Sequence, residues 1–215
     1  MNKKQAVITP TITTDDPHEF RDQMTLIGGF ADGVHLDFSD GVFSPSTLLH
    51  IKDAWRSDDL ITHAHVMYQD PYSVIAAIEN LEADLVILHA ESDNVKKCLQ
   101  KLSENGTRAG IALLPDSDVS DIVDLEIDGL FEHVLVFGGR LGFQGSDADM
   151  EQLNKIKAIK KTYPGIEIGW DGGVNDANVK SIVSGGVDVV NVGGHIKNAD
   201  KPQKAYDKLV SLIQS

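Results

Sequence analysis

The chain has 215 residues, of which 41% are hydrophobic and 24% are charged, a composition typical of a soluble globular protein. The formal net charge of −14 argues against binding to nucleic acid or anionic membranes, and no apolar run approaches the roughly 18 residues that span a bilayer. The single cysteine, Cys98, excludes an internal disulfide and indicates a cytoplasmic protein. The charge does not oppose binding of a divalent cation.

Short apolar strands alternate with amphipathic helical segments along the whole chain. Strands are predicted at residues 5–9, 33–38, 60–66, 84–90, 108–114, 133–138, 166–171 and 188–194. Helices are predicted at residues 17–28, 45–56, 72–81, 93–105, 118–127, 149–162, 175–184 and 201–214. Eight such units predict a parallel sheet closed into one (β/α)8 TIM barrel, a single domain over residues 1–215. A doubly wound open sheet is the alternative, but no GxGxxG fingerprint follows the first strand.

The stretch VHLDFSDGVF, at residues 34–43, places an imidazole and a carboxylate on one face of a predicted strand. Side chains alternate along a strand, so His35 and Asp37 point the same way. His65 and Asp171 stand near the carboxyl ends of two other predicted strands, where the chemistry of a TIM barrel takes place. These four groups predict a site for one divalent ion (Zn, Fe, Mn or Co) with a position left for substrate. A hydrogen-bonded polar strand end is the alternative reading of the pair.

The residues that other catalytic mechanisms require are absent from the predicted strand ends. The fifteen lysines lie on predicted helices, at the N-terminus or in the loop after the eighth strand, so no strand carries a Schiff-base lysine. Cys98 belongs to a predicted helix, and no GxSxG motif occurs. Acid–base chemistry by carboxylates around a metal is what remains.

Glycine pairs end the seventh and eighth predicted strands. DGGVND (171–176) contains Gly172 and Gly173, and VGGHIKNAD (192–200) contains Gly193 and Gly194. Backbone N–H groups in such loops bind phosphate, and a phosphate site after strands 7 and 8 is frequent in this fold. The loop at 138–149 adds Gly142 and Gly145. We therefore predict a phosphorylated ligand, although glycines that only turn the chain would produce the same pattern.

These motifs together resemble the ribulose-phosphate 3-epimerase family. VHLDFSDGVFSP resembles the family's HVDVMDGHFVP, THAHVMYQDP resembles DVHLMVENP, and LHAE resembles VHAE. GIALLP, WDGGVN and ITPTI resemble GVALNP, VDGGVN and IAPSI in the same way. The similarity runs from about residue 8 to 197 with the motifs in family order. It implies a TIM barrel of the ribulose-phosphate-binding type.

The resemblance also implies roles for particular residues. The family's metal ligands fall on His35, Asp37, His65 and Asp171, and its acid–base pair falls on the two aspartates. One aspartate removes the proton alpha to the ketose carbonyl and the other returns a proton to the opposite face, while the metal stabilises the enediolate. Contacts to substrate and phosphate fall on Thr11, Met67, Gly142, Gly145, Gly172, Gly173, Gly193 and Gly194. A homo-oligomer, a dimer or larger, is implied as well.

The sequence departs from the family around the pocket. The family's MTVNPGFGGQ is replaced by FGGRLGFQGS (137–146), which introduces Arg140. A family serine is Thr11, and the serine of the closing GSAIF motif is Gly194, followed by His195. The proton-transfer and metal residues match the family while the pocket is altered, so the resemblance implies the reaction type and leaves the substrate open.

The expected function is metal-dependent 3-epimerisation of a phosphorylated ketose, with D-ribulose 5-phosphate to D-xylulose 5-phosphate as the leading reaction. Alternatives are 3-epimerisation of a hexulose 6-phosphate of the allulose 6-phosphate type, an aldol-type phosphosugar lyase or decarboxylase, and a non-catalytic phosphosugar-binding barrel. His63 is interpreted as a partner of the ligands rather than a fifth ligand, His89 as a packed polar residue, and Trp170 as a core residue.

Overall fold

The computed structural model describes residues 5–139, 141 and 145–214. Its eight strands form one closed barrel in chain order, and each strand is parallel to its neighbours. The strands are β1 (Val7–Ile12), β2 (Gly33–Ser39), β3 (Ile61–Met67), β4 (Leu85–His89), β5 (Ala109–Leu113), β6 (His133–Phe137), β7 (Glu167–Asp171) and β8 (Val189–Val192). Pairing of β1 with β8 closes the sheet. The predicted TIM barrel is confirmed, and the open-sheet alternative is wrong.

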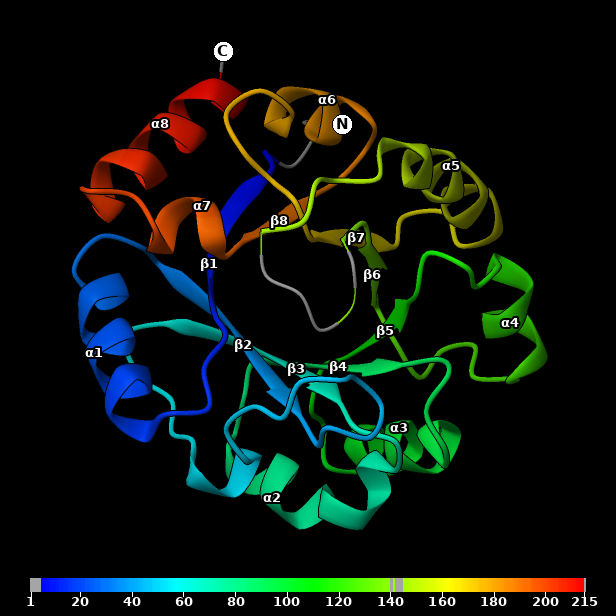
Figure 1. The fold of residues 1–215 in the computed structure, drawn as a ribbon. Coiled ribbons are helices and arrows are strands. Elements are labelled where there is room, and N and C mark those ends of the chain that lie inside the picture. The colour runs from blue at the N-terminus through cyan, green and yellow to red at the C-terminus, as the bar shows by residue number, and fades with distance from the viewer. Residues whose placement is uncertain (1–4, 140, 142–144, 215) are drawn as a thin grey trace.

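Helices surround the barrel as an outer ring (Figure 1). The α-helices are α1 (Pro17–Gly28), α2 (Ile75–Asn80), α3 (Val95–Glu104), α4 (Val119–Asp124), α5 (Leu153–Thr162), α6 (Val179–Ser184), α7 (Gly194–Lys197) and α8 (Pro202–Gln214). Three short 3₁₀ helices are η1 (Ile51–Asp53), η2 (Pro71–Val74) and η3 (Met150–Gln152). Within these described ranges, no helix has the length and apolarity required to cross a membrane.

The longer helices follow directly from local sequence signals. Asp16 caps α1 by accepting a 2.8 Å hydrogen bond from the backbone N–H of His18, and Pro17 occupies the first turn, where its missing N–H costs nothing. In α3, the buried residues Val95, Cys98, Leu99 and Leu102 recur at helical spacing, so one face of the helix packs against the sheet.

The strands separate two layers of side chains. On β2, Val34, Leu36 and Phe38 belong to the large core between sheet and helices, so His35 and Asp37 point into the barrel. Inside the barrel, a separate apolar cluster is built by Leu85, Ile87, Ala112 and Leu135, from β4, β5 and β6. The same strands also direct two buried histidines inward, His89 from β4 and His133 from β6.

The helix predicted at residues 45–56 is wrong. Most of this segment is irregular, and only η1 forms a short turn within it. Leu48 N–H donates to the Ser39 carbonyl at 3.1 Å, and Leu49 N–H donates to the Thr14 carbonyl at 2.9 Å. These long-range bonds use backbone donors that a helix would need for itself. The helix predicted at 175–184 begins only at Val179, and α7, which was not predicted, follows β8.

Candidate metal centre and active site

Four inward-pointing side chains meet at the carboxyl end of the barrel. His35 and Asp37 come from β2, His65 comes from β3 and Asp171 comes from β7. One ligand atom from each lies within 4.8 Å of those of the other three. The exposed fraction of the side chain is 0% for both histidines, 9% for Asp37 and 11% for Asp171. The sequence-predicted ligands are therefore brought together in one nearly buried cluster.

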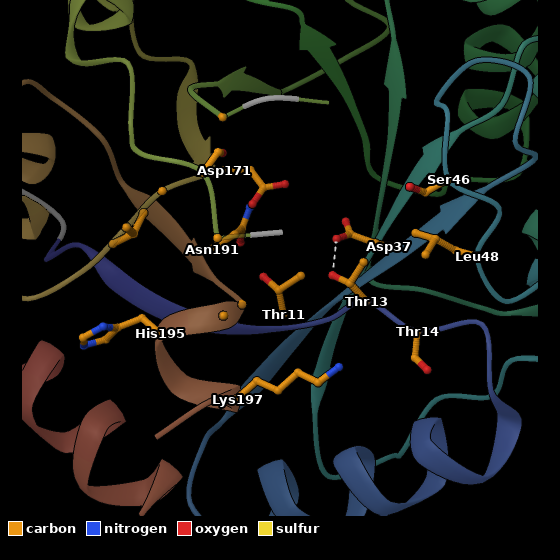
Figure 2. A pocket seen from close by; sticks show the side chains of 18 of the residues that line it. Thr11, Thr13, Thr14, Asp37, Ser46, Leu48, Asp171, Asn191, His195 and Lys197 are labelled. Carbon is orange, nitrogen blue, oxygen red and sulfur yellow. Dashed lines mark hydrogen bonds between the residues drawn. The ribbon is translucent and has the colours of Figure 1, made fainter. Parts of the chain in front are cut away.

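Asp37 lies at the centre of the cluster. Its Oδ1 is 3.0 Å from His65 Nδ1 and 3.4 Å from His35 Nε2. Its Oδ2 accepts a 2.7 Å hydrogen bond from the Thr13 hydroxyl, as Figure 2 shows. Asp171 approaches from the other side, with Oδ2 3.8 Å from His65 Nδ1. Both aspartates thus face the same imidazole from different strands.

The donor set fits a divalent transition-type ion. Neither ring nitrogen of His35 meets the geometry of a hydrogen bond, although the residue is completely buried and its Nε2 lies 3.4 Å from Asp37 Oδ1. A buried imidazole whose hydrogen-bonding atoms are not satisfied destabilises the fold, and a cation at the cluster would satisfy one of them. Two imidazole nitrogens and two carboxylates are a ligand mix that Zn, Fe, Mn and Co all accept. The four residues can hold such an ion, and their types do not select among these metals.

The two carboxyl groups differ in their proton affinity. Burial by itself would raise the pKa of Asp37, but the adjacent imidazoles of His35 and His65 outweigh burial and hold that pKa well below its usual range. Burial and the nearby charge of Asp37 raise the pKa of Asp171. The carboxyl group of Asp37 is therefore ionised at neutral pH, and Asp171 has the greater proton affinity of the two.

A second set of polar residues lies behind His65. Its Nε2 is 2.9 Å from His89 Nε2, and His89 Nδ1 is 3.3 Å from Glu91 Oε2. Glu91 Oε1 accepts a 2.9 Å hydrogen bond from the Leu114 N–H and another from the Ser117 hydroxyl. His89, interpreted from the sequence as a packed polar residue, is thus connected directly to a residue of the cluster.

A cavity of about 710 Å³ opens above the cluster. Its lining includes both aspartates and the predicted contact residues Thr11, Met67, Gly145, Gly172, Gly173, Gly193 and Gly194. Gly142, predicted with them, and Arg140 lie outside the described residues. Gly172 and Gly173 have φ values of 107° and 70°, and a Cβ on either would lie within 3.0 Å of backbone atoms. Only glycine fits at these two positions without strain.

His63 and Trp170 are the two other residues near the cluster for which the sequence predicts a role. His63 lies outside the four-residue cluster, and in the described part of the chain no hydrogen bond joins it to a cluster residue. Burial lowers its pKa to about 3, which keeps it neutral. Trp170 is a core residue, as predicted, and its indole N–H donates to the Gly172 carbonyl at 2.9 Å.

Three further polar residues of the cavity were not predicted from the sequence. Asn191, Thr13 and Lys197 line it, and Lys197 Nζ forms a 2.8 Å ion pair with Glu19. An asparagine within the valine-rich run VVNV was a signal for Asn191, because a polar residue there must point into the barrel. Thr13 and Lys197 lie in a loop and a short helix, where no periodicity indicates the direction of a side chain.

A family model described as "Ribulose-phosphate 3 epimerase family" matches residues 7–196. The chain belongs to the ribulose-phosphate 3-epimerase family. The protein named ribulose-phosphate 3-epimerase from Aquifex aeolicus is 30% identical over 204 residues, which cover 90% of this chain and 89% of the relative. The cytoplasmic isoform from Oryza sativa subsp. japonica is 27% identical over 199 residues, covering 90% of this chain and 86% of the relative.

Membership of the ribulose-phosphate 3-epimerase family makes this chain an enzyme of the isomerase class.

Solved structures with lower sequence identity share the fold of this chain. A 3-hexulose-6-phosphate synthase from Salmonella typhimurium has a TM-score of 0.71 at 16% identity, covering 97% of this chain and 98% of that chain. A 3-keto-L-gulonate-6-phosphate decarboxylase from Vibrio cholerae also has a TM-score of 0.71, at 13% identity, with 98% coverage of both chains. At these identities the likeness extends to the barrel alone.

Proposed function

We propose that the protein catalyses metal-dependent 3-epimerisation of a phosphorylated ketose, interconverting D-ribulose 5-phosphate and D-xylulose 5-phosphate. The observation that carries the proposal is the meeting of two carboxyl groups from different strands, Asp37 and Asp171, at one cavity. They reach it from β2 and β7, on different sides in Figure 2. Inversion at carbon needs two proton-transfer groups on opposite faces of a planar intermediate, and this pair supports that requirement.

Each residue of the cluster has a part in the proposed reaction. Asp37, deprotonated because its pKa is low, removes the C3 proton of one epimer, and Asp171, whose pKa is raised, returns a proton to the other face. The roles exchange for the reverse reaction. Thr13 orients Asp37 through its 2.7 Å hydrogen bond. A divalent ion held by His35, Asp37, His65 and Asp171 would act as a Lewis acid, stabilising the negative charge of the enediolate.

The phosphate is proposed to lie at the glycine side of the cavity. Gly172, Gly173, Gly193 and Gly194 line it there, and their backbone lets a phosphate approach closely. Gly145 contributes from the loop that follows β6. Met67 and Thr11 are proposed to contact the sugar.

A hexulose 6-phosphate is the second candidate substrate, because a cavity of about 710 Å³ also has room for a six-carbon chain. An aldol-type lyase is less well supported, since no described strand residue is a lysine. We also propose that the enzyme works in the cytoplasm as a homo-oligomer. The single cysteine supports the compartment, and the assembly follows from the resemblance alone.

The proposal is tested by a coupled assay with ribulose 5-phosphate, in the presence and absence of a chelator. The variant Asp171→Asn keeps the shape of the side chain but removes the proton carrier, and Asp32→Asn, at an exposed position, is the matched control. With metal occupancy confirmed by elemental analysis, Asp171→Asn should lose about 10²–10⁴-fold in kcat and the control should not change.

In deuterated water, the same variant should still exchange the C3 proton of the epimer that presents its C–H bond to Asp37. Near-normal epimerisation by metal-loaded Asp171→Asn would exclude the two-carboxylate mechanism. Absence of turnover by the unmodified enzyme with Zn, Fe, Mn or Co, on both ribulose 5-phosphate and allulose 6-phosphate, would exclude the proposed activity.

A further inference from the structure

β8 carries one polar side chain, Asn191, in the run VVNV. Val190 and Val192 pack into the core beneath the helices, so Asn191 points into the barrel, where it is 1% exposed. Neither its amide oxygen nor its amide nitrogen has a hydrogen-bond partner. Burying an amide without partners destabilises the folded state, and valine would suit the strand better. Folding alone therefore provides no reason for an asparagine at this position.

Asn191 lies between the two ends of the proposed active site. It is paired in register with Asp171 of β7, and Gly193 and Gly194 follow it two and three residues later in the chain. Thr11 of β1 lines the same cavity, and its hydroxyl also lacks a partner. Figure 2 shows Asn191 between Asp171 and Thr11. Unpaired polar atoms thus lie between the proton-transfer carboxyl group and the glycines proposed to receive the phosphate.

The chemistry of these atoms selects a neutral hydroxyl group. An amide offers one acceptor oxygen and two N–H donors without charge, and a hydroxyl group both donates and accepts. In a ketose 5-phosphate, the C4 hydroxyl lies between the reacting C3 and the phosphate-bearing C5. We propose that Asn191, assisted by Thr11, is a specificity-determining residue that hydrogen-bonds the C4 hydroxyl of the substrate. This inference rests on the proposed function and narrows its substrates to ketose phosphates that carry this hydroxyl.

The test compares ribulose 5-phosphate with its 4-deoxy analogue, for binding by calorimetry and for turnover. The variant is Asn191→Val, and the matched control is Thr9→Val, which lies beside Asn191 in register and does not line the cavity. Wild-type enzyme should prefer the hydroxylated sugar by about ten- to a hundredfold. Asn191→Val should lose this preference, and its Tm should equal or exceed that of the wild type.

A higher or equal Tm is the readout that separates recognition from a structural role, because removing an unsatisfied amide does not destabilise the protein. An unchanged preference for the hydroxylated sugar in Asn191→Val would overturn the inference. An equal loss of that preference in Thr9→Val would overturn it as well. Failure of wild-type enzyme to bind either sugar would overturn it too. Binding with the expected preference but without turnover would uphold the inference and overturn only the proposed reaction.

A separate observation concerns His89 and Glu91. Glu91 accepts hydrogen bonds from Leu114 N–H and Ser117, so its carboxylate is also an acceptor toward His89 Nδ1 at 3.3 Å. His89 Nδ1 is then the donor, and His89 Nε2 must accept from His65 Nε2 at 2.9 Å. That arrangement leaves the lone pair of His65 Nδ1 facing Asp37 and Asp171. We infer that His89 and Glu91 are positioning residues that keep His65 in the tautomer required of a metal ligand.

The substitution Glu91→Gln tests this inference. With its oxygen satisfied by Leu114, the new amide N–H₂ would face His89 and reverse every donor in the series, placing a proton on His65 Nδ1. We expect the dissociation constant for Co²⁺, measured by absorption, to rise about 10–100-fold. Glu132→Gln, the same change at the protein surface, is the control.

A Tm of chelator-treated Glu91→Gln close to that of chelator-treated wild type would show that the variant folds. Conversion of Glu91 to alanine, which frees His89 without reversing it, should weaken Co²⁺ binding less than Glu91→Gln. Unchanged Co²⁺ affinity in Glu91→Gln would refute the positioning role. Wild-type protein that binds no Co²⁺ would refute both the role and the proposed metal centre.

Discussion

The substitution Gly173→Ala should lower the stability of the fold and weaken substrate binding. The φ value of 70° costs an L-residue about 1–2 kcal/mol. A Cβ at this position would also lie within 3.0 Å of backbone atoms of Asp147 and Ala148, which cannot rotate away. Overpacking of this kind costs about 1–3 kcal/mol, so Gly173→Ala should lower the free energy of unfolding by about 2–5 kcal/mol.

Gly165 provides the matched control. Its φ of 87° is equally unfavourable to alanine, but a Cβ there would meet nothing within 4 Å. Both substitutions restrict the unfolded chain in the same way, so the difference between them, about 1–3 kcal/mol, measures the steric clash alone. Urea unfolding of the chelator-treated proteins is the assay. The KM of Gly173→Ala for ribulose 5-phosphate should rise roughly tenfold or more, because Asp147 beside the clash lines the cavity. Equal losses of stability in the two variants would refute the reasoning.

Three other predictions address the interior of the barrel. Burial lowers the pKa of His133 from its ordinary value of 6.5, although a 3.1 Å hydrogen bond with Glu167 opposes the shift. The folded state therefore favours the neutral imidazole, and this contribution to stability is complete above pH 6.5 and is lost as the pH falls. Between about pH 7.5 and about pH 5.5, the free energy of unfolding should therefore fall less steeply in His133→Gln than in the wild type, by up to about 1.4 kcal/mol per pH unit. The free energy is measured by urea unfolding at each pH, and parallel curves for the two proteins would contradict this prediction. Leu135→Ala should cost about 2–5 kcal/mol in urea unfolding because Leu135 is 0% exposed within the inner apolar cluster, and a cost under about 1 kcal/mol would show that the cluster repacks freely. Adding Co²⁺ to chelator-treated protein at about 1,000 times its dissociation constant should stabilise it by about 4 kcal/mol, and an unchanged Tm would argue against the metal centre.

The barrel and its cluster could be predicted because their signals are local and periodic. Alternating apolar strands and amphipathic helices indicate a parallel sheet, and this inference does not depend on knowing which residues the helices contact. His35 and Asp37 share one face of β2 because side chains alternate along a strand, and the carboxyl ends of parallel strands meet at one end of a barrel. His65 and Asp171 therefore had to lie near them once the fold was known, and the structure places all four within 4.8 Å.

Residues 45–56 show where local signals fail. Ser44 followed by Pro45 is a helix start signal, yet Leu48 and Leu49 donate their N–H groups to Ser39 and Thr14. Those acceptors belong to β2 and the loop after β1, and only the folded chain brings them close. Backbone hydrogen bonds between distant segments outweigh a weak intrinsic helix preference, and no short window of sequence contains them.

By itself, the sequence determined the fold, the four residues that could hold a metal and the glycines that border the cavity. The tertiary structure decided what these groups do to one another. It lowers the pKa of Asp37 and raises that of Asp171, connects His65 to Glu91 through His89, and leaves Asn191 without partners. Proton affinity, tautomer and hydrogen-bond satisfaction depend on distances of a few ångströms between different strands, which exist only when the barrel is closed.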